Sequence, residues 1–459
     1  MTLRPVASVL LALVITGCQS VDVEPASPSL QIPAAWRQSN GPASPTERVW
    51  WRNFHDSYLN RYVDQALRNN SDVLIARERV NEYQAQVYAA EGSLFPTLDA
   101  GLDGTRARTQ SAATGLPAYT TLYRGNLTAS YDVDIWGVNR STANAARASL
   151  AAQKAAAAAA DLTVASSVAS GYVTLLALDE QLKVTQATLK SREEAWKLAK
   201  RQYETGYSSR LELMQSDSEL RSTRAQVPLL EHQIAQQENA LSILLGSNPQ
   251  GIARNDRFDA LTPLALPAQL PSSLLNRRPD IVQAERELIA ADASLAASRA
   301  SLLPSLNLTA SASVQDRTLS GLLDNPFRLW SVGGSILAPL LNRQALNAQV
   351  DISQSQRNQA LYNYERTVRN AFREVNDSLD AITRYQQQLS ELQAQQEVAQ
   401  ETLRIASNRY RNGYSSYLDE LDAQRTLFSV QLNVVQAKNN LLLAQIDLYK
   451  ALGGGWNGS

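Results

Sequence analysis

The sequence predicts a mainly helical protein with a smaller β component, built from two copies of one structural unit. Three observations support this fold class. The two halves of the chain match each other at an offset of about 207 residues. Each half contains two short runs in which apolar and polar residues alternate, which is typical of strands with one apolar and one wet face. Most of the remainder has helical periodicity and very little proline or glycine.

The composition argues against several functional classes. The 459 residues carry 43 Lys+Arg and 44 Asp+Glu, a net charge of −1, which does not favour nucleic acid as a partner. There are only two His and one Cys, so a Cys/His metal site lacks ligands and histidine-based catalysis has two candidates without a recognisable setting. We therefore expect no catalytic residues, no metal site and no cofactor.

The N-terminus has the features of a targeting signal. Arg4 precedes an apolar stretch of about ten residues, which is too short to span a bilayer. The following Ile15-Thr16-Gly17-Cys18 resembles a bacterial lipobox, so Cys18, the only cysteine, is the expected lipid attachment site; an ordinary signal peptide with a chance cysteine is the alternative. The Pro/Ser/Ala-rich segment after it suggests an extended tether. No later segment has eighteen consecutive apolar residues, so we expect no transmembrane helix.

Four segments alternate like strands: they begin near Pro96, at Tyr123, after Pro304 and, less regularly, at Phe327. This is the pattern of a transmembrane barrel, although a soluble antiparallel sheet with one exposed face alternates in the same way. Four strands cannot close a barrel, and unpaired edges are not tolerated in lipid. A barrel therefore requires several chains. Its expected lipid-facing residues include Leu127, Ala129, Tyr131, Leu306 and Leu308.

Two long helical hairpins account for most of the chain. Residues 139–203 contain no proline and a single glycine, and residues 343–412 have the same character. Each stretch leads to a Gly-Tyr-Ser-Ser turn, at Gly206 and Gly413, and then to another helix. Apolar residues from 418 to 449 recur in steps of three and four, which indicates coiled-coil packing. A soluble helical bundle is the alternative, but it does not explain the inserted strands.

The predicted organisation follows from these boundaries. It comprises a lipoprotein signal peptide (1–17), an acylated tether (18–48), a first repeat (49–250), an equatorial linker (251–276), a second repeat (277–452) and a C-terminal tail (453–459).

Several sequence blocks together resemble one protein family. They include Ser130 to Gly137 (SYDVDIWG), Arg277 to Ile281 (RRPDI), Leu303 to Leu306 (LPSL), Leu421 to Arg425 (LDAQR) and Leu448 to Trp456 (LYKALGGGW). No single block is specific, but together they are, and the resemblance extends over nearly the whole mature chain. The chain resembles outer-membrane efflux proteins of the TolC type, in the acylated OprM-like (NodT-type) branch.

The resemblance implies a homotrimer. It would form a 12-stranded outer-membrane β-barrel, with four strands per chain, continuous with a long periplasmic α-helical barrel and girdled by a mixed equatorial collar. The implied function is the passive exit duct of a tripartite efflux pump, without catalysis of its own. The implied partners are a periplasmic adaptor (membrane fusion) protein, an inner-membrane RND-type transporter and outer-membrane lipid. The implied location is the bacterial outer membrane, lipid-anchored, with a large periplasmic part.

The resemblance also implies a gate at the periplasmic tip of the helices. The family's constriction matches Leu418, Asp419 and Asp422, and its linking polar contacts match Tyr410 and Glu212. Three copies of Asp422 around an axis would gather like charges, and three of Leu418 would add an apolar constriction. A solvated surface charge is the alternative for Asp422. The arginine of the TolC latch falls on Ser415, so Arg210 or Arg411 is expected to replace it.

Three functions remain open at this point. The first is an efflux conduit for small toxic compounds. The second is the outer-membrane channel of a type I polypeptide secretion system. The third is a lipid-anchored periplasmic scaffold that never spans the membrane.

Overall fold

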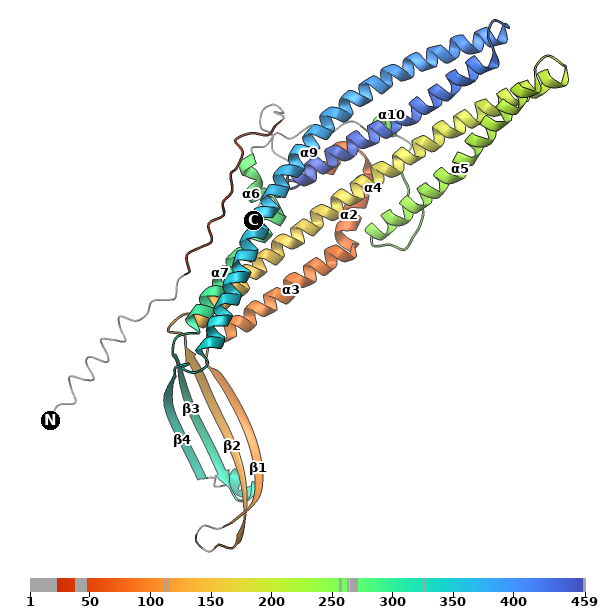
Figure 1. Cartoon of the computed structure of the whole chain (residues 1–459). Helices are drawn as coiled ribbons and strands as arrows, with labels where there is room; N and C mark the ends of the chain where they lie inside the picture. Colours follow the sequence, from red (N-terminus) through yellow and green to blue (C-terminus); the bar gives the residue numbers. More distant parts are fainter. Residues whose placement is uncertain are drawn as a thin grey trace. The chain divides into compact units, whose positions relative to one another are not determined.

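The structure is a computed structural model that describes residues 23–37, 48–110, 113, 115–255, 258–261, 264, 271–324 and 327–456. It is mainly helical with one four-stranded sheet (Figure 1), which confirms the predicted fold class. The elements are η1 (Trp50–Phe54), α2 (Ser57–Asn69), α3 (Ser71–Gly92), β1 (Thr97–Gln110), β2 (Pro117–Val133), α4 (Val138–Glu204), α5 (Arg210–Leu244), η2 (Phe258–Ala260), η3 (Pro271–Ser273), α6 (Leu274–Arg277), α7 (Pro279–Ala300), β3 (Ser305–Asp316), α8 (Leu319–Asp324), β4 (Phe327–Leu337), α9 (Arg343–Arg411) and α10 (Tyr417–Ala451).

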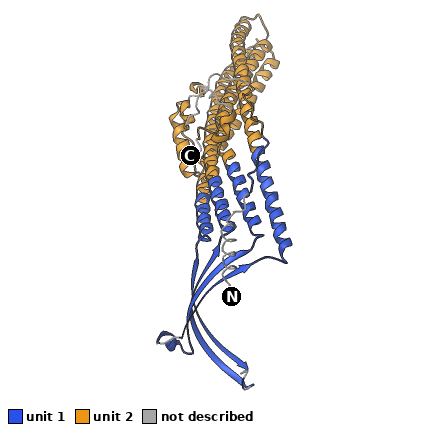
Figure 2. Ribbon diagram, turned by 90° about the vertical axis from the view of Figure 1, so that its left-hand side faces the viewer, with its two compact units in different colours: residues 1–29, 79–153, 283–365 blue, residues 30–78, 154–282, 366–459 orange. Residues whose placement is uncertain are grey.

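The chain forms two compact units (Figure 2). Unit 1 contains residues 1–29, 79–153 and 283–365, and therefore the whole sheet. Unit 2 contains residues 30–78, 154–282 and 366–459, and therefore both hairpin turns with all of α5 and α10. Each unit takes segments from both sequence repeats, because the long helices α4 and α9 contribute residues to both units.

The sheet in unit 1 is antiparallel, with the strands in chain order β1-β2-β3-β4. Its register places Leu127 opposite Ala100 on one side and Ala312 on the other. Because directly opposed residues lie on the same face, the alternation gives the sheet one mainly apolar face and one mainly polar face, although Phe327, Leu329 and Leu337 of β4 lie on the polar one. Each edge strand, β1 or β4, has only one strand partner in the described chain.

Helices α7 and α9 carry further contacts within unit 1. Arg357 pairs with Asp292 at 2.9 Å, and both side chains are mostly buried. The segment after the predicted lipid site also lies here: Ala26 N–H donates to the Asp292 carboxylate, and Ser29 N–H donates to Glu365. Residues 23–37 form no helix or strand. Specific hydrogen bonds nevertheless hold its backbone at Ala26 and Ser29.

The hydrophobic core of unit 2 lies where α2, α4, α5 and α10 meet. Trp50 stacks on Tyr449 with ring centroids 5.4 Å apart, and Tyr172 is fully buried nearby in the same core cluster. A side-chain carbon added at Gly171 would lie 2.9 Å from a Leu241 methyl carbon. The single glycine of the long α4 stretch therefore allows α5 to pack closely against it.

One described helix, α4, is long and apolar enough to cross a membrane by length and composition alone. The sequence has no unbroken apolar run of eighteen residues, so α4 meets this criterion only through its average composition over an 18-residue window. About half of that window, 56%, is buried inside the protein, as expected for a core helix.

Arg278 secures the end of α10. It is buried, and its guanidinium donates to the Ala451 carbonyl at 3.0 Å and to the carboxylates of Glu374 and Asp280 at 2.8 and 2.7 Å. Pro279 is the first residue of α7, where its missing N–H costs no helical hydrogen bond. The Arg-Arg-Pro-Asp block therefore joins three helices.

Candidate functional site

The two hairpin turns in unit 2 have the same construction. Tyr207 N–H donates to Gln202 O and Gly206 N–H to Tyr203 O, and Tyr414 and Gly413 repeat this pattern with Arg409 and Tyr410. This pair of hydrogen bonds ends a helix at a residue in the left-handed backbone conformation, and both glycines have φ near +75°. Ser209 and Ser416 then cap the next helices. The matched Gly-Tyr-Ser-Ser sequences therefore encode matched turns.

The predicted gate residues occupy the first turns of α10. Leu418 is 55% exposed, and Asp422, one helical turn further, is also exposed. Both are therefore free to face another copy of the chain. Asp419 has a local role as well, because its carboxylate accepts the Ser416 N–H at 3.1 Å in a capping box.

Tyr410 and Glu212, the two polar residues that the resemblance singles out, lie close enough to interact electrostatically. The Tyr410 hydroxyl donates to Gln202 Oε1 at 3.2 Å, and the Tyr410 ring lies against Tyr417. Burial, followed by the nearby Glu212 and Glu420 carboxylates, raises the pKa of Tyr410 to about 12. The hydroxyl is therefore protonated and available as a donor at neutral pH.

An ion-pair cluster that the sequence did not predict links the three helices α4, α5 and α10. We call Arg192, Glu219 and Arg425 the Glu219 cluster. Arg192 of α4 contacts Glu219 of α5 at 2.9 Å, and Arg425 Nε of α10 donates to the same carboxylate at 2.9 Å. Arg192 also hydrogen-bonds Thr223 and lies over the Phe428 ring. One carboxylate thus joins the first hairpin to the second.

The replacement of the TolC latch arginine by Arg210 or Arg411 stays a prediction. In the described residues, neither has a carboxylate within ion-pair distance, whereas Arg192 and Arg425 both pair with Glu219. The Ser415 hydroxyl is buried and has no partner among the described residues. The Leu-Asp-Ala-Gln-Arg block that contains Arg425 was part of the family resemblance, but nothing in it points to Glu219.

Glu420 is a buried carboxylate at the same end of α10. It accepts hydrogen bonds from the Ser407 hydroxyl of α9 at 2.7 Å and from Gln424. A hydroxyl and an amide, rather than a cation, satisfy this carboxylate. The hydrogen bond from Ser407 connects α10 to α9, its partner in the hairpin.

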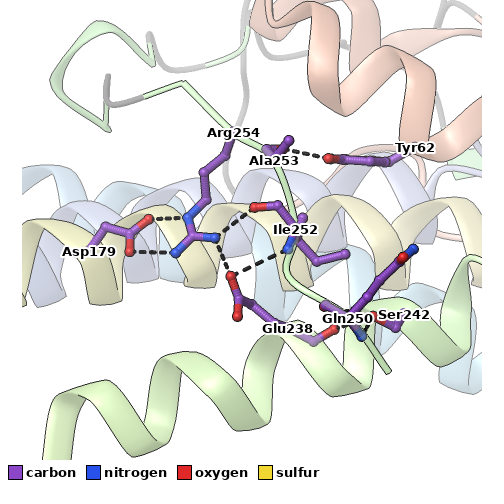
Figure 3. A network of polar contacts seen from close by, with 8 residues as sticks. All are labelled: Tyr62, Asp179, Glu238, Ser242, Gln250, Ile252, Ala253 and Arg254. Carbon is purple, nitrogen blue, oxygen red and sulfur yellow. Dashed lines mark hydrogen bonds and ion pairs between the residues drawn. The ribbon is translucent and has the colours of Figure 1, made fainter. Parts of the chain in front are cut away.

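The linker between the repeats is fastened to both hairpins. Arg254 binds Asp179 of α4 through two nitrogens and Glu238 of α5 through a third contact (Figure 3). On the other side, Lys438 of α10 donates to the Phe258 and Asp259 carbonyls. Gln445 of α10 donates to the Leu264 carbonyl and accepts the Leu264 N–H. The linker therefore connects the α4–α5 hairpin to α10 of the second hairpin, at positions far in sequence from the turns at Gly206 and Gly413.

The five predicted lipid-facing residues lie on one face of the sheet in unit 1. Tyr131 opposes Leu308, and Leu127 and Ala129 oppose Ala312 and Ala310. Leu306 lies two residues before Leu308 and so shares the face. This face is open to solvent in a single chain, and its apolar side chains at Leu98, Leu102, Leu127, Trp330, Val332 and Ile336 are all exposed.

Two further predictions concern residues or groups outside this geometry. Cys18, the expected lipid attachment site, lies outside the described residues. Among the residues that the structure describes, no group of three or more His, Cys, Asp or Glu side chains is placed to hold a metal ion.

Comparisons with known proteins place this architecture among outer-membrane channels. Residues 62–247 and 270–454 match the family described as outer membrane efflux protein. The chain is 34% identical over 458 residues to the antibiotic efflux pump outer membrane protein ArpC of Pseudomonas putida, covering 97% of this chain and 94% of the relative. It is 31% identical to the probable outer membrane lipoprotein SilC of Salmonella typhimurium, covering 98% of each. The Campylobacter jejuni CmeC outer membrane channel has a similar structure, with a TM-score of 0.89 at 25% identity over 96% of both chains.

Proposed function

This chain belongs to the outer membrane efflux protein family, and from that premise we propose that it is the outer-membrane exit channel of an efflux pump. The channel conducts small toxic compounds passively from the periplasm to the exterior. The similarity to ArpC, which is named for antibiotic efflux, supports this cargo class over polypeptides. The chain contributes a conduit and has no catalytic step of its own.

The observation that carries the proposal is the open sheet in unit 1. Its apolar face is exposed, its other face is polar, and both edge strands lack a second partner in the described chain. Apolar patches of this extent on a folded protein mark a surface that another apolar phase covers. In lipid, the edges must also be paired. Three copies close such sheets into one barrel of twelve strands, with the polar face lining the lumen.

The remaining partners follow from this role. We place the helical hairpins in the periplasm, where an adaptor protein and an inner-membrane RND-type transporter deliver the cargo. Acylation of Cys18 adds a lipid anchor, which the similarity to a probable lipoprotein, SilC, supports. A diacylated N-terminus combined with the barrel gives two membrane attachments, which is sufficient for stable anchoring.

Compound accumulation tests the cargo class directly. Cells lacking the protein should accumulate dyes and antibiotics, and expression of the intact chain should restore normal levels. Secreted polypeptides are measured in the same cultures. Retention of a polypeptide inside the cell, with normal loss of small compounds, would favour a type I secretion channel instead.

We further propose that Leu418 and Asp422 close the channel at the hairpin turns. Three exposed leucines around the axis form an apolar constriction, and the neighbouring aspartates form a ring of negative charge. Replacing both residues, Leu418→Ala with Asp422→Ala, should raise single-channel conductance in planar bilayers several-fold. The matched control is Glu397→Ala with Val398→Ala, which removes one exposed acid and one exposed apolar side chain from α9. Equal conductance of the two double variants would contradict the gate.

A further inference from the structure

The apolar face of the sheet changes character towards the ends of the strands that adjoin residues 111–116 and 317–326, which we call the loop end. Counting along the register, every charged residue on this face lies at the loop end. They are Arg106 and Arg108 in β1, Arg328 in β4 and Asp316 at the last position of β3. The other charged residues of the four strands, Asp99, Asp103, Arg124 and Asp132, lie on the polar face.

The three arginines are available for a ligand. All three are exposed, and none has a carboxylate within ion-pair distance in the part of the chain that the structure describes. The acid on this face, Asp316, is already engaged, because its Oδ1 accepts the Thr318 N–H at 2.8 Å and the Thr318 hydroxyl at 3.0 Å. Among the described residues, the loop end of the apolar face therefore carries positive charges without a carboxylate partner.

Aromatic residues lie on the same face of the sheet as these arginines. The Arg108 guanidinium lies 5.7 Å from the centre of the Tyr119 ring, directly across the strand pair. Tyr123 packs over Gly104, where an added side-chain carbon would lie 3.0 Å from its ring. Trp330 is on the same face of β4 and is 81% exposed. Tyrosine and tryptophan collect where the hydrocarbon of a bilayer meets its head groups.

The position of the arginines fits this boundary. An arginine facing hydrocarbon costs about 2–4 kcal/mol at the bilayer midplane but about 0–1 kcal/mol near the interface. At the interface, a guanidinium can form two parallel hydrogen bonds to one phosphate group. Closure of the barrel would also pair β4 of one copy with β1 of the next, which brings Arg328 onto the strand beside Arg106 and Arg108.

We propose that Arg106 and Arg108, together with Arg328 of the adjoining copy, bind the phosphate groups of phosphorylated lipid head groups in the outer leaflet. This inference rests on the proposed function, because it requires the apolar face to lie in the membrane. It assigns a ligand to the outside of the barrel, separate from the cargo that passes through the lumen.

Lipid retention by the purified full-length protein tests the proposal. The probe is diphosphorylated lipid A in mixed detergent micelles, with dephosphorylated lipid A and inorganic phosphate as comparators, and bound lipid is counted by native mass spectrometry. The Arg106→Gln/Arg108→Gln variant should bind diphosphorylated lipid A about tenfold or more weakly, since each lost charge-assisted bond contributes at this scale. The matched control is Arg124→Gln, an exposed arginine of the same strand pair on the polar face, which should bind as the unaltered protein does.

Several outcomes would overturn the proposal. The first is equal lipid binding by the double variant and the Arg124→Gln control, and the second is equal binding of lipid A with and without its phosphates. The third is displacement of bound lipid A by inorganic phosphate at the same concentration as the lipid. If the double variant does not assemble, the comparison of the two lipids on the unaltered protein still tests whether binding depends on the phosphate groups. Insertion and conductance are measured on the same preparations, because an unaltered protein that does not insert contradicts the proposed function, whereas normal insertion without phosphate preference contradicts only the lipid site.

Discussion

Replacing Leu127 with arginine should abolish assembly of the protein in the outer membrane. Leu127 lies in the middle of β2, between Ala100 of β1 and Ala312 of β3, and its side chain is on the exposed apolar face. A charged side chain on the lipid face costs about 2–4 kcal/mol at the midplane. The cost recurs in every copy around the barrel, and the neighbouring alanines offer the guanidinium no partner.

The adjacent residue provides the control. Thr128 points to the polar face, where it opposes Asp99 and Ser311, so Thr128→Arg should assemble normally. The measurement is the amount of folded oligomer recovered from the outer-membrane fraction. If Leu127→Arg and Thr128→Arg assembled equally well, both faces of the sheet would be wet, and a periplasmic scaffold would be favoured over a channel.

Local sequence signals were sufficient for the elements of this fold. Alternation predicted the four strands, clearly for the first three and less regularly for the one at Phe327, because a period of two places one residue type on each face. Alternation understated the length of β1 and β2, whose loop ends contain Arg106, Arg108 and several threonines and tyrosines. The turns at Gly206 and Gly413 were also predictable, since glycine followed by a serine cap ends one helix and starts the next.

Contacts between distant residues were not predictable in this way. Arg192 and Glu219 lie on different helices, and Arg425 is 206 residues from Glu219 in the sequence. No periodicity relates such positions. Because the family's latch arginine is replaced by Ser415 in this chain, the sequence suggested only the nearest arginines, Arg210 and Arg411, as substitutes. Leu418 shows the same limit, because it fits the spacing of the helical seam although the packed seam begins at Leu421 and leaves it exposed.

Glu219→Gln should both destabilise the helical hairpins and loosen the closed channel. The side chains of Arg192 and Glu219 are only 6% and 12% exposed, so solvent screens their interaction weakly. Removing one partner of a buried pair costs about 3–5 kcal/mol, because the remaining charge is left uncompensated. Burial already lowers the pKa of Arg192, and the attraction of the Glu219 carboxylate is the largest effect that raises it again. Arg425 would lose its carboxylate at the same time, which frees α10 from α5.

A surface pair between the same two helices serves as the matched control for this prediction. Glu193 of α4 pairs with Arg224 of α5 at 2.8 Å, but these side chains are 37% and 58% exposed. Exposed pairs contribute about 0–1 kcal/mol, so Glu193→Gln should leave thermal unfolding and conductance nearly unchanged. Equal unfolding temperatures of the two variants would contradict the buried-pair argument. A Glu219→Gln variant that unfolds earlier but conducts like the unaltered protein would confine the cluster to stability, and closure would then depend on the exposed residues Leu418 and Asp422 alone.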